Sequence, residues 1–443
     1  MKKTIGIVLI FFNCYFISAQ DVNYSFSLSE AVNYAMTHNY TVRNAVLDIE
    51  AAENLKKETT AFGLPQIEGT VDYQNFLKQV VTLIPSEFIG QPPGDFVEVI
   101  FGTKQNLNAT VTLRQLLFDG SYLVGLQSAK TFLKISNLAK EKTDQSIREA
   151  VINAYGNVLI AQETILILEK NKLSLEKNLN DTKAFLKNGF AEEQDVEQQQ
   201  ITLSNTNNDL NRAVRFELIA NQMFNLTMGI PIATNVKLED NLEMLTLKST
   251  DLNIISQTFN LDSHIDFKIA DNKVISDELL VKFEKSKYLP SLNAFINYSQ
   301  FANNDNQIFY SGNWFDSSLF GVSLNVPIFS GFQRSSRTQQ AKISLLQSEI
   351  ELTETSEKLK LQVTTAKNKY QFALDQFQTA KQNLVLAESI SNKEEIKFFE
   401  GISTSIDLTN AQNQLFNQQQ NYIQSIFEII QTKVELENAL NIY

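Results

Sequence analysis

The sequence is short of the residues from which most catalytic and metal sites are built. It has one cysteine, Cys14, and two histidines, His38 and His264. A zinc site needs three or four converging ligands, and neither histidine has a cysteine or a carboxylate cluster near it in the sequence. We therefore expect both histidines to lie on the surface, with no metal and no cofactor. A phosphate-binding P-loop and a nucleophile elbow are also missing, so nothing in the sequence supports an enzyme.

Positive charge and long apolar runs are scarce as well. Lysine and arginine number 38 against 50 aspartates and glutamates, which gives a formal net charge of −12. A nucleic-acid-binding protein must neutralise phosphate, so an acidic chain excludes nucleic acid as the expected partner. After residue 20, no segment approaches eighteen uninterrupted apolar residues. We therefore expect no helix of the mature chain to span a membrane.

Residues 1–19 have the parts of a secretory signal peptide. Lys2 and Lys3 form its charged start, Ile5–Phe16 is mostly apolar, and Ala19 offers a small residue for cleavage. A membrane anchor, the alternative, would need a longer apolar run. Cys14 lies inside this segment, in a context unlike that of lipid-modified cysteines. The mature chain is therefore expected to be exported and to carry no thiol.

Glycine and proline are almost absent from the last quarter of the chain. Between Phe332 and Tyr443 there is one glycine, Gly401, and no proline. Such a stretch predicts two long helices that meet at this glycine. The first would be about 105 Å long. Its apolar residues recur in steps of three and four, which is typical of a coiled coil: Val363, Ala366, Tyr370, Ala373, Phe377, Ala380, Leu384 and Ala387.

The rest of the chain predicts the same order of elements twice. The first copy, residues 20–229, contains a helix over 28–62, a β-hairpin over 66–118 whose strands flank a loop at 77–105, a helix over 121–188 and a helix over 191–228. The second copy, residues 261–443, contains a helix, a hairpin over 291–329 with a loop at 302–316, and the two helices of the tail. Residues 230–260 form a linker with some small structure. The chain is therefore interpreted as a tandem duplication.

The four predicted strands each have one apolar and one polar face. A soluble sandwich would bury the apolar faces, but the rest of the chain offers no second sheet. A transmembrane barrel would turn them to lipid and enclose a wide lumen of mixed polarity, with Glu68, Asp72 and Arg114 inside. An open sheet edge is not tolerated in hydrocarbon, and a barrel needs about eight strands or more. Several chains must then share one barrel, and strand counting does not decide between two and three.

Short motifs at the helix–strand junctions are similar to those of the TolC-like outer-membrane efflux channels, the outer-membrane efflux protein family. The resemblance covers nearly all of the mature chain and depends on the order and duplication of the motifs. They are Leu64-Pro65-Gln66 and Leu289-Pro290-Ser291, Gln115-Leu116-Leu117-Phe118-Asp119-Gly120, Val326-Pro327-Ile328-Phe329-Ser330-Gly331, and the helical turns Gly189 with Asp195 and Gly401 with Asp407.

The resemblance implies a mostly α-helical protein with a four-strand β contribution, assembled as a homotrimer. A twelve-stranded transmembrane β-barrel, in contact with outer-membrane lipid, would continue into a periplasmic α-helical coiled-coil tunnel in a Gram-negative bacterium. The channel would be the exit duct of a tripartite efflux pump or type I secretion system. Its partners would be a periplasmic adaptor (membrane fusion) protein and an inner-membrane transporter of the RND or ABC type.

The family also implies where the periplasmic mouth closes. Gly189 and Gly401 would mark the tips of the helical hairpins, and Asp195 and Asp407 stand at the positions whose aspartates face the pore. The second acidic position is Asn410 here, and the tyrosine and arginine of the closing lock in the family's best-studied member fall on Phe398 and Ser403. Both aspartates also suit a purely capping role, because each follows a glycine at the start of a helix.

A second function remains open from the sequence. A structural or adhesive coiled-coil surface protein would use the strands as a soluble cap and would not conduct ions. The two hypotheses differ in one observation, namely whether detergent extracts a trimer that conducts in a planar bilayer.

Overall fold

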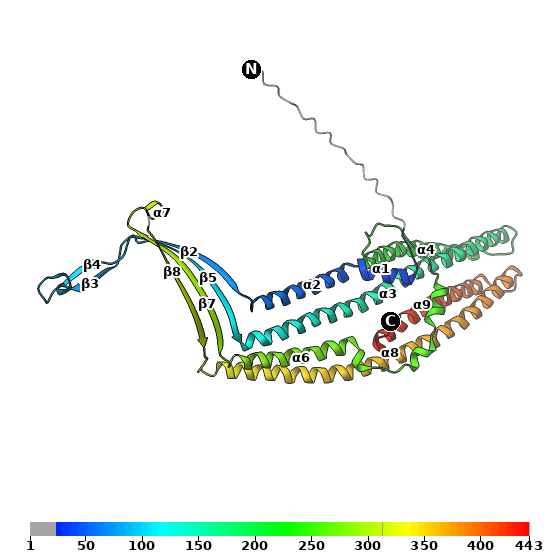
Figure 1. Ribbon diagram of the computed structural model, residues 1–443. Helices are drawn as coiled ribbons and strands as arrows, with labels where there is room; N and C mark the ends of the chain where they lie inside the picture. The colour runs from blue at the N-terminus through cyan, green and yellow to red at the C-terminus, as the bar shows by residue number, and fades with distance from the viewer. Residues whose placement is uncertain (1–23, 312, 443) are drawn as a thin grey trace, which may run out of the picture. The chain divides into compact units, whose positions relative to one another are not determined.

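The computed structural model describes residues 24–311 and 313–442 (Figure 1). The expected signal peptide, with Cys14, lies outside these residues. The chain is mostly helical, with one four-stranded sheet and two small two-stranded sheets. Contacts divide it into two compact units. Of the described residues, unit 1 contains 24–43, 143–259 and 361–442, and unit 2 contains those within 44–142 and 260–360.

Unit 2 contains the four-stranded antiparallel sheet. Its strands, in spatial order, are β2 (Gln66–Asn75), β5 (Gln105–Asp119), β7 (Ser291–Asn304) and β8 (Asn313–Asn325). The four predicted strands are confirmed. They run further than expected, since β7 and β8 extend into the predicted loop at 302–316. Strands β2 and β8 form the two edges of the sheet.

The register of the sheet separates its two faces. In one row across the strands, Ile67 pairs with Leu113, Leu113 with Ile296, and Ile296 with Phe320. The adjacent row begins with Glu68 opposite Thr112. Because side chains alternate between faces along a strand, the first row belongs to an apolar face and the second to a polar one. The alternation expected from the sequence is therefore present on all four strands.

The segment between β2 and β5 is not the irregular loop that the sequence predicts over 77–105. It contains β3 (Val81–Pro85), the 3-10 turn η1 (Ser86–Ile89) and β4 (Phe96–Ile100). Strands β3 and β4 pair antiparallel with each other. Prolines and glycines obscure the alternating pattern of these strands in the sequence. Most of them lie in the turn between β3 and β4 or in the segments that join the hairpin to β2 and β5, so two five-residue strands remain. The second connection, between β7 and β8, carries the short helix α7 (Ile308–Ser311).

The remaining parts of unit 2 are helical. They are α2 (Tyr40–Ala61) from residue 44 on, the first part of α3 (Gly120–Lys187), η3 (Leu261–Ser263), α6 (Ile265–Ser286) and the first part of α8 (Gln333–Phe399). The sequence predicts one helix over 28–62, whereas the structure has α1 (Leu28–His38) and α2. Asn39 ends the first helix, because its side chain accepts hydrogen bonds from the N–H groups of Thr41 and Val42 and so starts the second.

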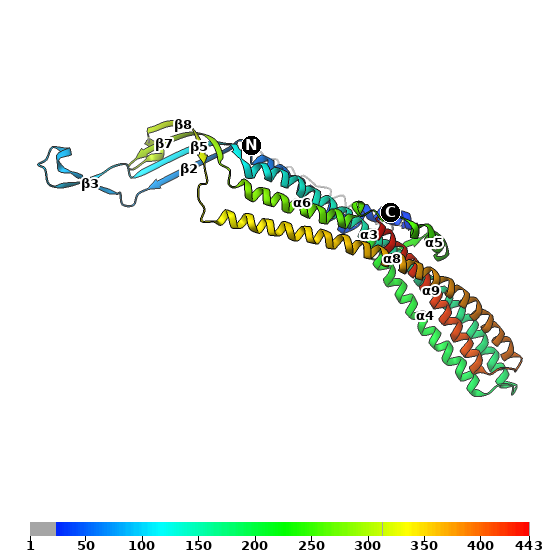
Figure 2. The same cartoon turned by 90° about the horizontal axis from the view of Figure 1, so that it is seen from below.

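Unit 1 holds α1, the remainder of α3 and α8, α4 (Glu193–Met228), α5 (Leu242–Ser249), η2 (Leu252–Ser256) and α9 (Ser405–Leu440). Helices α3, α4, α8 and α9 run side by side (Figures 1 and 2). Strands β1 (Tyr24–Phe26) and β6 (Val236–Leu238) form a parallel pair. The predicted seam of α8 is confirmed, since Val363, Ala366 and Tyr370 are buried.

Two buried tyrosines fix the small elements of unit 1 onto the long helices. The Tyr370 hydroxyl donates to the Ser249 carbonyl at 2.6 Å and accepts from the Asp251 N–H at 2.9 Å. The Tyr155 hydroxyl lies 3.1 Å from the Phe26 carbonyl oxygen and accepts from the Asp240 N–H at 3.2 Å. Burial raises the pKa of both tyrosines above the ordinary value. Each hydroxyl therefore stays neutral and holds a connecting segment in place.

The expectation that both histidines are exposed is wrong for one of them. His38 is exposed, but His264 is only 1% exposed. Its Nδ1 accepts a hydrogen bond from the Asp266 N–H at the start of α6. The ring thus satisfies one of the amides at the start of α6, and nothing in the local sequence pattern reveals this.

Length and composition alone would allow one helix among the described residues, α3, to cross a membrane. Its most apolar eighteen-residue window has a mean hydropathy of 1.4 and is half buried. In unit 1 the α3 residues Val151, Tyr155 and Val158 belong to the hydrophobic core. The apolar character of α3 is therefore accounted for by packing against other helices of the same unit.

Candidate functional site

The tip between α3 and α4 is built around Gly189. This residue has φ +78°, and the Phe190 N–H donates to the Phe185 carbonyl, which closes the last turn of α3. The left-handed conformation suits glycine because a Cβ would be strained there. Across the turn, the Asp195 carboxylate accepts from the Glu192 N–H at 2.9 Å. Asp195 therefore caps the start of α4.

The tip between α8 and α9 repeats this design around Gly401, whose φ is +75°. The Thr404 hydroxyl accepts from the Asp407 N–H at 3.2 Å, and the Asp407 carboxylate accepts from the Thr404 N–H at 3.2 Å. This reciprocal pair is a capping box. The two tips touch through Phe185 and Phe399, whose ring centroids are 5.8 Å apart.

The charge of Asp407 is stabilised locally. Hydrogen bonds from the Thr404 hydroxyl and the Thr404 N–H lower the pKa of the Asp407 carboxyl, and the positive charge of Lys397 lowers it further. The carboxyl is fully exposed. It is therefore a persistent negative charge at an exposed helix start, although its contacts within the chain are those of a cap.

The structure brings three of the predicted pore residues together. Ser403, Asp407 and Asn410 line one open hollow of about 470 Å³, together with the ion pair between Glu394 and Lys397. Phe398 does not line it. It is buried and stacks edge-on against Phe399. Asp195 is on the other hairpin and does not line it either.

The predicted junction residues lie between helices and strands. The Asp119 carboxylate accepts from the N–H groups of Ser121 and Tyr122 and so begins α3. Gly120 has no side chain because the α6 end is close, and a Cβ would stand 2.7 Å from Leu289 Cδ1. Pro65 and Pro290 each directly precede a strand, where a residue without an N–H is tolerated.

The second junction depends on an arginine that sequence reasoning did not select. The Arg334 guanidinium donates to the Pro327 carbonyl at 3.2 Å and lies over the Tyr288 ring, 5.3 Å from its centroid. It thus ties the chain after β8 to the end of α6. Gly331 adopts a left-handed φ of +56° just before α8, while Phe329 and Phe118 remain exposed. Arg334 follows the glycine by three residues, and this spacing is the only signal that could have indicated it.

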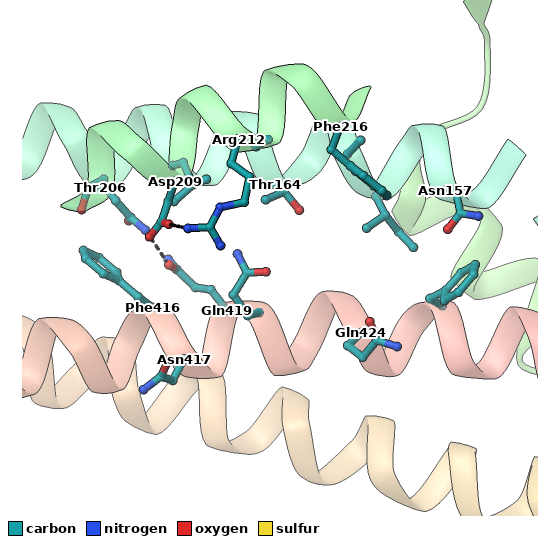
Figure 3. A pocket seen from close by; sticks show the side chains of 17 residues that line it. Asn157, Thr164, Thr206, Asp209, Arg212, Phe216, Phe416, Asn417, Gln419 and Gln424 are labelled. Atoms are coloured by element: carbon teal, nitrogen blue, oxygen red, sulfur yellow. Dashed lines mark hydrogen bonds and ion pairs between the residues drawn. The ribbon is translucent and has the colours of Figure 1, made fainter. Parts of the chain in front are cut away.

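Unit 1 also contains a cavity of about 570 Å³ between α3, α4 and α9 (Figure 3). Asp209 and Arg212 of α4 form an ion pair at 2.7 Å, and Asn171 of α3 donates to Gln419 of α9 at 2.8 Å. The apolar part of the wall comes from phenylalanines that include Phe216, together with aliphatic residues such as Ile160 and Leu168. The wall therefore combines carboxamides, one guanidinium and aromatic rings, and sequence reasoning had not singled it out.

Over residues 24–311 and 313–442, no group of three or more histidines, cysteines, aspartates or glutamates is placed to hold a metal ion.

The structure thus joins a four-stranded sheet with an apolar and a polar face to two helices of 68 and 67 residues. The chain belongs to the outer membrane efflux protein family, whose model matches residues 31–223 and 266–441. It is accordingly an outer-membrane protein.

Relatives and solved structures agree with this assignment. The chain is 22% identical to the outer membrane protein TolC of Vibrio cholerae over 343 residues, covering 75% of this chain and 76% of the relative. It is 24% identical to the outer membrane efflux protein BepC of Brucella suis, over 74% of this chain and 71% of the relative. Among solved structures, the chain matches CusC with a TM-score of 0.74 and 17% identity, over 93% of this chain and 91% of the CusC chain. The CusC structures were described in connection with folding and transmembrane channel formation.

Proposed function

We propose that three copies of this chain form one outer-membrane channel that passively conducts cargo from a periplasmic adaptor and an inner-membrane pump to the exterior. The pump would be of the RND or ABC type, in a tripartite efflux pump or a type I secretion system. Each chain would be a tandem duplication that contributes four of twelve barrel strands, and the helices would form the tunnel.

The observation that carries this proposal is the two-faced sheet with two unpaired edges. Strands β2 and β8 pair on one side only. A membrane-spanning sheet must satisfy every backbone N–H and C=O, so β2 of one copy would pair with β8 of the next. The apolar face ends in a row whose two edge residues, Tyr73 and Trp314, are exposed aromatics, which suits the aromatic girdle of a barrel.

The same observation argues against a structural or adhesive role without transport. Within the described residues no second sheet covers the apolar face, and Ile67, Val71 and Phe320 are exposed on it. A soluble cap would leave this surface in water.

Reconstitution tests the channel. Protein extracted in detergent should run as a trimer and give discrete ion conductance in a planar bilayer. A purified chain that remains monomeric and water-soluble without detergent would exclude a shared barrel.

We further propose that the α8–α9 tips of three copies narrow the periplasmic mouth, with Asp407 supplying the charged ring and Ser403, Asn410 and Phe398 supporting it. Asp195 would act at the α3–α4 tip. The support is that Ser403, Asp407 and Asn410 line one hollow and that the Asp407 charge is stabilised by Thr404. The lock cannot be an arginine–aspartate pair, because serine stands at position 403.

A pair of variants separates a pore role from a capping role. Asp407→Asn removes the charge and keeps an acceptor for the Thr404 N–H, so we expect cation preference to fall. Thr404→Ala breaks the capping box and keeps the charge, so it should cost about 0.5–2 kcal/mol of stability and leave cation preference as it is. Equal ion selectivity in wild type and Asp407→Asn would remove Asp407 from the pore.

We propose that the groove between α3, α4 and α9 receives a helix of the adaptor. The support is that Phe216 lines the groove and begins an exposed stripe on α4 that continues through Ile219, Met223 and Leu226. These residues follow the three- and four-residue spacing that amphipathic helices use for docking. Arg212 would orient the partner through a carboxylate.

Charge reversal tests this docking. Arg212→Glu should weaken adaptor binding at least tenfold in a pull-down or surface-binding assay and leave bilayer conductance unchanged. Lys381→Glu, an exposed position on α8 that does not line the groove, is the matched control. Unaltered adaptor affinity in Arg212→Glu would place the docking surface elsewhere.

A further inference from the structure

The hairpin β3–β4 is an apolar structure without an apolar core. Its ten strand residues include a single charge, Glu98, and one other polar residue, Thr82. Across residues 76–104 the only buried residue is Ser86. The exposed side chains include Leu83, Phe88 and Phe96, and Phe88 is 82% exposed at the apex. A two-stranded hairpin with this surface is marginal in water unless something covers it.

The apex of the hairpin is nevertheless ordered. The Ser86 N–H donates to the Asp95 carbonyl at 2.9 Å, and the Gln91 N–H donates to the Ser86 carbonyl at 3.1 Å. Gly90 and Gly94 take left-handed φ values of +80° and +118° to close the turn. The apolar residues are thus displayed on a defined turn, rather than on a loose loop.

Both faces of the hairpin are apolar. Leu83 pairs with Glu98 on one face, and Ile84 pairs with Val97 on the other. A single flat partner would cover one face only. In a three-fold assembly each copy has two neighbours and presents a different surface to each, so a sheet that is apolar on both faces suits it.

The hairpin is long enough to meet its counterparts. Twelve strands about 4.8 Å apart and tilted by about 40° give a barrel radius of about 12 Å. The stem after Asn75 and strand β3 together span up to about 30 Å. A hairpin that starts at the rim therefore reaches the axis, where tethering keeps the three copies at high effective concentration.

The other connection of the sheet behaves differently. Ile308 of α7 is only 1% exposed and packs with Leu107 and Ala302 on its own sheet, and its N–H donates to the Gln105 side chain. The second connection therefore has a buried anchor on its own sheet, although Phe309 is exposed, whereas the apolar strand residues of the β3–β4 hairpin have no such anchor among the described residues.

We propose that the β3–β4 hairpins of three copies converge over the barrel axis and pack their apolar faces against one another, forming a lid on the outer mouth of the channel. This inference rests on the proposed trimeric barrel. The occupant of the apolar surface is thus a second and a third copy of the same hairpin, and outflowing cargo must part them.

Disulfide trapping tests the contact, because the mature chain contains no cysteine. Phe88→Cys should give interprotomer disulfides on mild oxidation of the detergent-extracted trimer. Asn306→Cys, on the exposed part of the other connection, is the matched control and should give none. Phe88→Cys trimers without any disulfide would overturn the lid, and would point to lipid or another protein as the cover.

Conductance tests the function of the lid. Replacing residues 80–101 by a short Gly-Ser linker should raise single-channel conductance at least twofold, as should the length-preserving triple change Leu83→Ser, Phe88→Ser and Phe96→Ser. Wild-type conductance in both variants, together with no Phe88→Cys disulfide, contradicts the inference while leaving the channel intact. A lack of conductance in every form would count against the channel itself.

Discussion

At the residue scale, Asp407 shows how a cap and a pore charge can be the same group. The Thr404 hydrogen bonds that start α9 also hold the pKa of the Asp407 carboxyl below its ordinary value of 3.8. The Asp407 carboxylate at the start of α9 therefore keeps its negative charge at any periplasmic pH. The two roles are compatible, because the capping hydrogen bonds keep Asp407 ionised and a role in the periplasmic mouth would need that negative charge.

This shift predicts a pH dependence. A lowered folded-state pKa contributes stability that is present above the unfolded pKa and is lost as the pH falls through the folded value. If Asp407 sets cation preference, that preference should persist as the pH is lowered to 3.8 and disappear only below it. Reversal potentials measured between pH 7 and pH 3 check this. Loss of selectivity near pH 5 would implicate a different group.

Asn178 is a residue where polarity is costly. It is fully buried on α3, and neither its amide nitrogen nor its carbonyl oxygen has a hydrogen-bond partner within the described residues. Asn178→Leu keeps the same branched skeleton of side-chain heavy atoms and removes two unsatisfied polar groups, so we expect it to stabilise the protein by about 1–3 kcal/mol. Thermal unfolding measures this. The exposed change Lys177→Leu on the same helix should shift the melting temperature little.

At the element scale, two glycines with nearly the same φ differ in how closely neighbouring backbone approaches them. Gly229 and Gly189 have φ of +77° and +78°. A Cβ at Gly229 would stand 2.3 Å from the His38 carbonyl oxygen, whereas a Cβ at Gly189 would meet nothing within 4 Å. The end of α1 therefore rests directly on the C-cap of α4, and the tip of α3 is open.

The contrast gives a matched pair of variants. Gly189→Ala should cost only the strain of a left-handed alanine, about 1–2 kcal/mol. Gly229→Ala adds a backbone clash that no rotamer relieves, so it should cost more than about 3 kcal/mol. Denaturant unfolding of the two variants in detergent compares them. Equal losses would show that α1 moves away from Gly229 at no cost.

Long periodic elements were predictable from the sequence, and single contacts were not. The seam through Val363 and Tyr370, the glycine hinges and the alternating strands follow from spacing that repeats over many residues. The β3–β4 hairpin was missed because each strand has five residues and lies among prolines and glycines. The burial of His264 and the anchoring by Arg334 depend on neighbours far apart in the sequence, which no local pattern encodes.

At the scale of the whole molecule, the core of unit 1 changes character along its helices. One large apolar cluster includes Tyr155, Phe224 and Ile426. Nearer the tips, many buried residues are polar, and they are Asn171, Asn178, Thr182, Gln199, Thr202, Thr206, Thr409, Gln412 and Gln419. Apolar burial contributes about 25 cal/mol per Å², whereas exchanging a hydrogen bond with water contributes little net free energy.

This gradient predicts local stability. Backbone amides of α3, α4 and α9 near Gly189 and Gly401 should exchange hydrogen faster than amides of the same helices near Tyr155 and Ile426. Hydrogen–deuterium exchange with peptide resolution checks the order. Uniform protection along α3 would mean that the polar stretch is held as firmly as the apolar one.

The hydrogen bond between Asn171 and Gln419 gives the gradient a mechanical meaning. The hydrogen bond between two such amides can break and form again, because water can replace either partner. The two helical hairpins can therefore separate starting from their tips. Separation of the hairpins from their tips would therefore stop at the large apolar cluster of unit 1, because opening that cluster exposes apolar side chains to water. The cluster thus limits how far the two hairpins can separate.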